Sequence, residues 1–148
     1  MAKLRVDVVT VERLVYAGEA DVVLVPGTEG QLGILPSHAP LLAELAPGGM
    51  VVRSGEGEVE MAVMGGFVEV LANRVVVLAS AAEQAGEIDL ERAERALRRA
   101  QERIRERVPD LDLPRALGAI SRSQARLRVA ARERARTGAR ERARPELG

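Results

Sequence analysis

The spacing of apolar residues along the chain changes at Gly86, and this change limits the folds that the chain can adopt. Before Gly86, short valine-rich segments such as "DVVLVP" and "RVVVLA" alternate with turn sequences such as "PGTEG" and "SGEGE". Many short strands between Gly- and Pro-rich turns are typical of an all-β sandwich or barrel. After Gly86, apolar residues recur at steps of three and four, which is the spacing of an amphipathic helix. The sequence therefore predicts an α+β protein in which a β-sandwich of about 8–10 short strands precedes two helices.

The helical part is predicted to be a two-helix antiparallel hairpin. The first apolar stripe runs from Leu90 to Val108, and Asp89 before it suits the N-cap position. Because Pro109 cannot lie inside a helix, the first helix ends there and a second is expected to begin near Asp112. The apolar stripe of the second helix is formed by Leu113, Leu117, Ile120, Leu127 and Ala131.

Three segments are expected along the chain. They are a β-sandwich domain over residues 1–86, the helical hairpin over 87–136, and a flexible tail over 137–148, where "TGARERARPELG" has no apolar stripe. The whole chain carries no net charge, but the first 86 residues carry −6 and the remainder +6. This asymmetry predicts that the two parts meet different partners.

Composition and motifs exclude several classes of function. The chain has no cysteine, which excludes disulfides and thiol catalysis. No run approaches the ~20 apolar residues of a membrane helix, and "MAKLRVDVVT" has no signal-peptide pattern, so a cytoplasmic protein is expected. We recognise no nucleophile–base pair, metal cluster or Gly-rich phosphate loop. The sequence therefore predicts a protein that is not an enzyme and requires no cofactor.

His38, the only histidine, lies in the apolar and proline-rich stretch "GQLGILPSHAPLL". A metal site needs several converging ligands, and a catalytic histidine needs an oriented partner, whereas Ser37 is the only candidate beside it. No metal site is predicted here. We expect His38 to be a loop residue that is satisfied by local backbone groups.

Three stretches carry a resemblance to a known family: "GTEGQLGILPSHAPLL", "GGFVEVLANRVVVLA" and "EIDLERAERALRRAQERI". In these the chain resembles the epsilon subunit of bacterial F-type ATP synthases. The resemblance implies a β-sandwich followed by two helices, in agreement with the pattern above. It also implies a non-catalytic central-stalk subunit that binds gamma and the c-ring, and so couples the catalytic head to the membrane rotor. Such a subunit is peripheral, at the cytoplasmic face of the bacterial cell membrane.

The resemblance also assigns a role to the loop from Gly27 to Pro40, which is similar to the family's contact surface for the c-ring and the foot of gamma. Leu32, Ile34 and Leu35 are expected to be exposed and to form an apolar docking patch. The full set of expected contact residues is Gln31, Leu32, Ile34, Leu35 and His38. The family often carries an acidic residue where this chain has Gln31, and this departure weakens the case for a salt bridge to the ring.

A second implied site lies on the helices. In the family, the C-terminal helices can extend toward the catalytic alpha and beta subunits and inhibit ATP hydrolysis. In some bacterial members, "IDLERA" and later arginines form an ATP site without a P-loop, which makes ATP a regulatory ligand. By this resemblance the adenine side is formed by Glu83, Ile88, Asp89 and Ala93. The phosphates would be bound by Arg92, Arg99, Arg122 and Arg126, since arginine offers forked hydrogen-bond donors.

Two alternatives stay open from the residues alone. The helix arginines also fit a solvated face with Glu–Arg pairs at i,i+4 spacing. Moreover, the two arginine pairs can reach one ligand only if the stripe of the second helix faces something other than the first helix, such as the sandwich. The Arg-rich "RLRVAARERARTGARERAR" also fits a nucleic-acid-binding β domain with a basic tail. Against that, the β domain is acidic and lacks an aromatic stacking platform.

Overall fold

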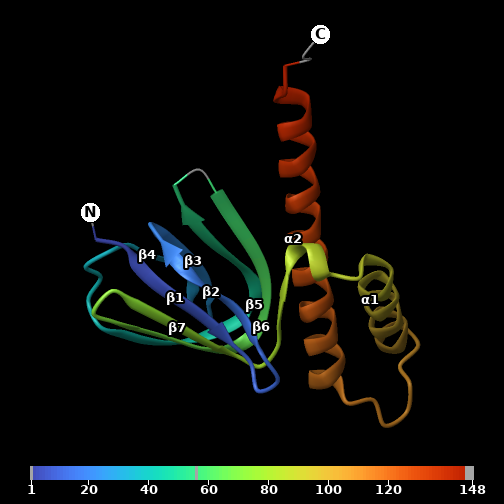
Figure 1. The fold of residues 1–148 in the computed structure, drawn as a ribbon. Helices are drawn as coiled ribbons and strands as arrows, with labels where there is room; N and C mark the ends of the chain where they lie inside the picture. Colours follow the sequence, from blue (N-terminus) through green and yellow to red (C-terminus); the bar gives the residue numbers. More distant parts are fainter. Residues whose placement is uncertain (1, 56, 146–148) are drawn as a thin grey trace.

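The computed structural model describes residues 2–55 and 57–145 and shows a β-sandwich beside a pair of helices (Figure 1). The strands within the described ranges are β1 (Leu4–Val9), β2 (Leu14–Ala20), β3 (Val22–Gly27), β4 (Gly30–Ile34), β5 (Leu41–Ser54), β6 (Gly57–Leu71), β7 (Arg74–Ala79) and β8 (Ala82–Gln84). A 3-10 turn, η1 (Ala85–Glu87), connects them to α1 (Leu90–Arg105) and α2 (Leu113–Ala143). The predicted α+β fold class is confirmed.

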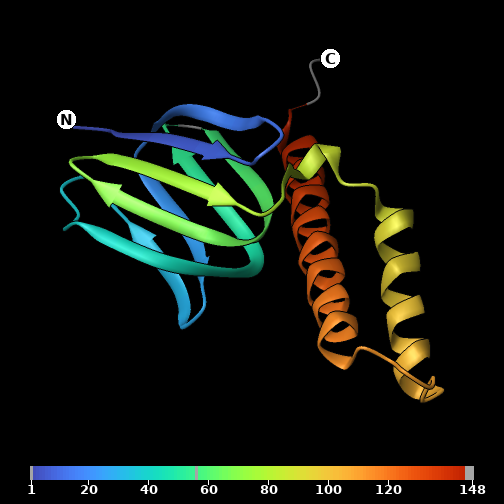
Figure 2. The same cartoon turned by 90° about the horizontal axis from the view of Figure 1, so that it is seen from below.

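The strands form one hydrogen-bonded path in the order β2-β1-β7-β6-β5-β3-β4, and β8 pairs with β6. The β1–β7 pair is parallel and the others are antiparallel. The two longest strands, β5 and β6, curve so that the sheet closes over its own apolar face (Figure 2). This closure buries a core of valine, leucine, isoleucine and methionine.

Alternation along each strand decides which side chains enter this core. In β1, Leu4, Val6 and Val8 are fully buried, while the residues between them face outward. Val75 and Val77 of β7 follow the same pattern. A period of two places every second side chain on one face, so the valine-rich strands supply a core that needs almost no aromatic residues.

Two adjacent glycines interrupt β6 where it changes partners. Met64 pairs with Pro47 of β5, whereas Gly66 pairs with Leu45, so one residue on each strand is skipped. Gly66 has a φ of 118°, and a Cβ there would lie 2.0 Å from the carbonyl oxygen of Leu78. Only glycine fits this close approach, and the kink lets β6 continue from β8 toward β7.

Both helices begin with the expected caps. The side chain of Asp89 accepts a hydrogen bond from the backbone N–H of Arg92 at 3.1 Å, which caps α1. Asp112 accepts from the N–H of Arg115 at the same distance and caps α2. The turn between the helices makes them antiparallel, which confirms the predicted hairpin (Figure 1).

Helix α2 departs from the prediction in two ways. It continues to Ala143 and so includes the first residues of the predicted flexible tail over 137–148; residues 146–148 of that tail lie outside the described ranges. The apolar stripe also differs, because Leu113 and Leu117 are exposed, as is Ala131, while Ile120 and Leu127 are only partly buried. The buried residues are instead Ala116, Ser123, Ala125, Val129 and Ala130.

The reason is that α2 lies between the sandwich and α1 (Figure 2). A helix that packs closely on two sides needs small residues on both. The first turns of α2, which carry the exposed Leu113 and Leu117, extend past the sandwich. The contact with the sandwich is a small apolar cluster of Ala62, Met64, Ala85, Ala125 and Val129. Among the described residues, no helix is both long enough and apolar enough to cross a membrane.

Candidate functional site

Two hollows lie along the hairpin. The first, here called the linker hollow, has a volume of about 390 Å³. Its walls come from four elements in turn, namely β8, η1, α1 with its cap, and α2. They are Glu83, Glu87, Asp89, Arg92, Ala93, Ala96 and Arg126. The second, the turn hollow, has a volume of about 610 Å³ and lies between the two helices near their connection.

The structure distributes the eight candidate ATP residues unequally. Five of them line the linker hollow: Glu83, Asp89, Arg92, Ala93 and Arg126. Arg99 and Arg122 line the turn hollow, together with Arg103 and Arg115. Ile88 packs against the apolar cluster beneath α2 and lines neither hollow. Ala96 belongs to both hollows, so they are neighbours along one groove.

The orientation of α2 meets the geometric condition raised by the sequence. Ala125 and Val129 face the sandwich, where they contact Ala62 and Met64. Arg122 and Arg126 lie beside this contact, on the flank of α2 toward α1, and line the two hollows there. Both arginine pairs border the same groove.

The charges differ between the hollows. In the linker hollow, Nε of Arg126 donates to Oε1 of Glu83 at 2.5 Å, which joins α2 to β8. The guanidinium groups of Arg92 and of the four arginines of the turn hollow have no carboxylate within 4.0 Å among the described residues. The turn hollow contains Asp110 and Asp112 against four arginines, so it carries excess positive charge. It suits an anion, and the linker hollow, which is lined by carboxylates, suits hydrogen-bond donors.

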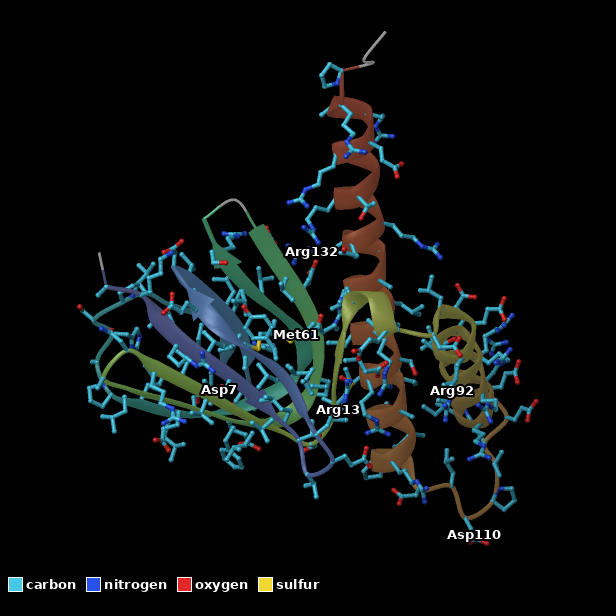
Figure 3. All side chains as sticks on the ribbon, in the orientation of Figure 1. Asp7, Arg13, Met61, Arg92, Asp110 and Arg132 are labelled. Atoms are coloured by element: carbon cyan, nitrogen blue, oxygen red, sulfur yellow. The ribbon has the colours of Figure 1, made fainter. Side chains whose placement is uncertain are left out.

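A second ion pair fixes the linker to the sandwich. Arg13, in the turn between β1 and β2, donates to both carboxylate oxygens of Glu87, at 2.5 and 3.3 Å. This hydrogen bond lowers the pKa of Glu87 below its ordinary value and raises that of Arg13. Both groups therefore stay charged, and η1 is held against the sandwich through Glu87, which also lines the linker hollow. Figure 3 shows Arg13 at the turn between β1 and β2.

The loop predicted to contact the rotor is only partly exposed. Ile34 is fully buried, because it pairs with Val23 across β3 and β4 and both side chains enter the core. The expectation that Ile34 forms a docking patch is therefore wrong. Leu32 is half-buried, while Gln31 and Leu35 are exposed.

His38 is satisfied locally, as expected. Its Nδ1 lies 2.7 Å from the carbonyl oxygen of Ala39 and donates to it in the tautomer that carries the proton there. Ser37 has a φ of 67°, and its N–H donates to the side chain of Asn73 at 2.6 Å. These two hydrogen bonds connect the loop to its own backbone and to the turn at Asn73. Among the described residues, no group of three side chains could bind a metal ion.

Sequence reasoning missed an apolar patch on the outer face of the sheet. Phe67, Leu78, Val9 and Leu14 lie side by side on β6, β7, β1 and β2. With neighbouring leucines they form what we call the outer face. Its large side chains are between 51 and 71% exposed: Leu14, Leu42, Phe67, Leu71 and Leu78. The signal was present in "GGFVEVLANRVVVLA", where apolar residues occupy both faces of a strand pattern.

The described architecture corresponds to two family models along the chain. Residues 3–85 match the β-sandwich domain of the ATP synthase delta/epsilon chain, and residues 87–131 match its long α-helix domain. The chain belongs to the ATP synthase delta/epsilon family. The resemblance that the sequence motifs carry is thereby confirmed, and the nucleic-acid-binding alternative has no support. Residues from Arg132 onward lie beyond both family models.

Bacterial relatives narrow the family to its epsilon members. The ATP synthase epsilon chain of Dehalococcoides mccartyi strain CBDB1 is 52% identical over 101 residues, which cover 68% of this chain and 72% of the relative. That of Carboxydothermus hydrogenoformans is 52% identical over 108 residues, which cover 72% and 80%. The fold of this epsilon-family chain is similar to a chain in the OSCP/F1/c-ring structure of Euglena gracilis mitochondrial ATP synthase. The TM-score is 0.72 at 24% identity, with 88% of this chain and 82% of the other covered.

Proposed function

We propose that this chain is a non-catalytic central-stalk subunit of an F-type ATP synthase and that its helical hairpin restrains ATP hydrolysis when it leaves the sandwich. One observation carries the regulatory part. The linker hollow has walls from β8, η1, α1 and α2, so it exists only while the hairpin is docked. A ligand that binds there must favour the docked form.

The sandwich is the part that binds the rotor. The outer face carries a row of adjacent apolar side chains, Phe67, Leu78, Val9 and Leu14, with further exposed leucines near them, which is typical of a protein-binding site. We assign it to gamma. The exposed residues Gln31 and Leu35, with half-buried Leu32 and His38 beside them, form a separate contact for the c-ring. The assembly of the Euglena relative contains F1 and a c-ring, which supports this placement. The chain would then be peripheral, at the cytoplasmic face of the bacterial cell membrane.

ATP is the ligand that best fits the groove. The carboxylates of the linker hollow can accept hydrogen bonds from the amino group of adenine and the ribose hydroxyls. The phosphates would extend past Ala96 to Arg99 and Arg122 in the turn hollow, where the arginines have no carboxylate partner. A bound nucleotide would join both helices and the linker to the sandwich.

When ATP is scarce, the hairpin is released. Its arginines are then free to meet acidic surfaces of the catalytic alpha and beta subunits. By linkage, the factor by which ATP favours docking equals the factor by which docking favours ATP. Low ATP therefore favours the inhibitory form, and high ATP the compact, permissive one.

Isothermal titration of the isolated chain with ATP tests this proposal. Arg122→Ala removes a cation that makes no ion pair within the described residues, so the change should leave the fold intact. Losing one charge-assisted hydrogen bond costs roughly 1.5–3 kcal/mol, which is at least about tenfold in affinity. The matched control is Arg128→Ala, because Arg128 is exposed on the same helix and lines neither hollow. Equal affinity in the two variants, or no binding at millimolar ATP, would refute the ATP site and leave the rotor role standing.

A further inference from the structure

Glu60 of β6 is the one buried charged residue in the part of the chain that the structure describes. Its side chain is 2% exposed and lies on the face of β6 that also carries Ala62 and Met64. That face is covered by α2 rather than by the sandwich core. A carboxylate in such a position depends on what the helix places above it.

The helix places a cation there. Nε of Arg132 lies 3.3 Å from Oε1 of Glu60, and Figure 3 shows Arg132 on the side of α2 that faces the sandwich. Arg132 follows Ala125 and Val129 at helical spacing, so the stripe that docks α2 ends in an arginine. Its own side chain is 58% exposed and remains largely hydrated.

The Glu60–Arg132 pair does not supply all the hydrogen bonds that a buried carboxylate needs. Oε1 of Glu60 has no hydrogen-bond partner among the described residues, and the contact with Arg132 is an ion pair without a hydrogen bond. Nearby, Arg136 donates to Glu133 at 2.6 Å, yet its own Nε is buried without a partner. A buried carboxylate left short of donors is costly, and the attraction to a cation offsets only part of that cost.

Other groups around Glu60 act in both directions. Burial raises the pKa of Glu60 above its ordinary value, and Glu58 and Glu133 raise it further, whereas Arg132 and Arg136 lower it. Glu58 is itself paired with Arg53 of β5 at 3.5 Å. The backbone of Gly49 in β5 also packs beside Glu60. A Cβ at Gly49 would lie 3.2 Å from Val129 and 3.9 Å from Glu60, so little space is left between the strand and the helix.

We propose that Glu60 and Arg132 form an electrostatic latch that keeps the docking of α2 on the sandwich marginal and therefore reversible. The proposal rests on the proposed movement of the hairpin. In it, Glu60 opposes docking because it must leave water, and Arg132 permits docking because it compensates the buried charge. Arg132 is the first residue beyond the family-matched helix, so the latch belongs to the extension of α2 in this chain.

The two partners should therefore have opposite effects when they are replaced. Glu60→Gln removes the buried charge and should shift the equilibrium toward docking. Arg132→Met keeps an apolar stem on the helix but leaves the carboxylate uncompensated, which should shift the equilibrium toward release. An ordinary stabilising salt bridge would instead lose docking in both variants, so the sign of the Glu60→Gln effect separates the two accounts.

The docked and released populations can be measured in the full chain by pulsed spin-label distances. The natural sequence has no cysteine, so Ala17→Cys and Ala135→Cys, both at exposed positions, provide the only labelling sites. We expect Arg132→Met to raise the ratio of released to docked molecules roughly tenfold and Glu60→Gln to lower it about fivefold. Arg134→Met is the matched control, because Arg134 is exposed and makes no ion pair within the described ranges. Glu60→Met repeats the test with a side chain that needs no hydrogen bond.

Acidity provides an independent readout. A carboxyl group whose pKa is higher when docked binds its proton more tightly in that state, so docking strengthens as the pH falls through the raised pKa. Other carboxylates also titrate in this range, so the test is the difference between natural chain and variant. As the pH falls toward 4.5, the ordinary pKa of a glutamate, the docked fraction should increase more in the natural chain than in Glu60→Gln.

The outcomes separate this proposal from the proposed function. The latch is refuted if Glu60→Gln and Glu60→Met both reduce docking, or if Arg132→Met changes it no more than Arg134→Met does. If the variants shift docking as expected but leave inhibition of ATP hydrolysis in the reconstituted complex unchanged, the latch stands and the regulatory function of the hairpin is contradicted.

Discussion

The sandwich and the hairpin of this chain are stabilised in different ways. The sandwich encloses fully buried valine, leucine, isoleucine and methionine side chains that are contributed by several strands. The hairpin buries mainly alanines, and its contact with the sandwich is a cluster of five small or medium-sized residues with ion pairs at its edge. Because stability follows buried apolar area, this difference is what the proposed release of the hairpin from a fixed sandwich requires.

The largest effect is expected from a cavity in the platform. Met61 is fully buried in the sandwich core, so Met61→Ala should lower the free energy of unfolding by about 2–5 kcal/mol. Denaturant titration followed by circular dichroism measures it. Val129→Ala, in the hairpin contact, should leave the unfolding midpoint of the sandwich almost unchanged and should increase hydrogen exchange in α1 and α2. If both variants lowered the stability of the sandwich by similar amounts, the sandwich would not be stable independently of the hairpin contact, contrary to this prediction.

A substitution on the outer face should affect binding and leave folding intact. Phe67 is half-exposed, so Phe67→Ser is expected to change the free energy of unfolding by less than about 0.5 kcal/mol. If the outer face binds gamma, loss of an aromatic anchor should weaken that complex by about 2 kcal/mol, or some thirtyfold. Surface plasmon resonance with purified gamma measures it. Leu113→Ser, at an exposed leucine of α2 remote from this face, should bind gamma normally.

The smallest effect is expected at the ion pair that holds the linker. The pKa of Glu87 is lowered by Arg13, so this contact stabilises the fold above the ordinary pKa of 4.5 and loses its effect as the pH falls through the lowered value. Both side chains are nearly half exposed, so Glu87→Gln should reduce stability only slightly at pH 7. The difference between natural chain and variant should disappear in thermal melts at acidic pH. A difference that grows on acidification would contradict the assignment.

Local sequence patterns were sufficient for much of this fold. The alternation in "KLRVDVVT" placed Leu4, Val6 and Val8 on one face, and all three are buried. Asp89 was identified as an N-cap from its position before a helical stripe, and the cap is present. Such features depend on residues close in sequence, so a single sequence records them.

What depended on packing between distant segments was predicted less well. Ile34 follows Leu32 by two residues in an apolar loop, and only the pairing of β4 with β3 decides that it is buried. The buried stripe of α2 was predicted to consist mainly of leucines. The helix instead packs closely against both α1 and the sandwich, which favours small residues such as Ala125 and Val129. The sequence of α2 alone does not show that two neighbours pack against it. The segment after Thr137 has no apolar stripe, yet alanine, arginine and glutamate are all strong helix formers.

The candidate ATP residues also combine a local feature, which the sequence predicts, with a packing feature, which it does not. The resemblance supplied the arginines, and spacing along each helix grouped Arg92 with Arg99 and Arg122 with Arg126, whereas Arg92 and Arg126 border one hollow. The antiparallel arrangement nevertheless places Arg99 and Arg122 in the neighbouring hollow, which only the register of the two helices determines. Glu60 was missed entirely, because a glutamate in "GEVEMAV" is a typical exposed strand residue until a helix covers it.

In the proposed function, ATP completes a site that exists only in the docked hairpin. The decisive measurement is the spin-label distance between positions 17 and 135 in the Arg132→Met background, where the released population is expected to be raised. Saturating ATP should convert the distribution to the single docked distance, whereas the same concentration of ATP should have little effect when Arg122→Ala is added. A distribution that does not change while ATP is bound, or that shifts toward the released distance, would contradict the account.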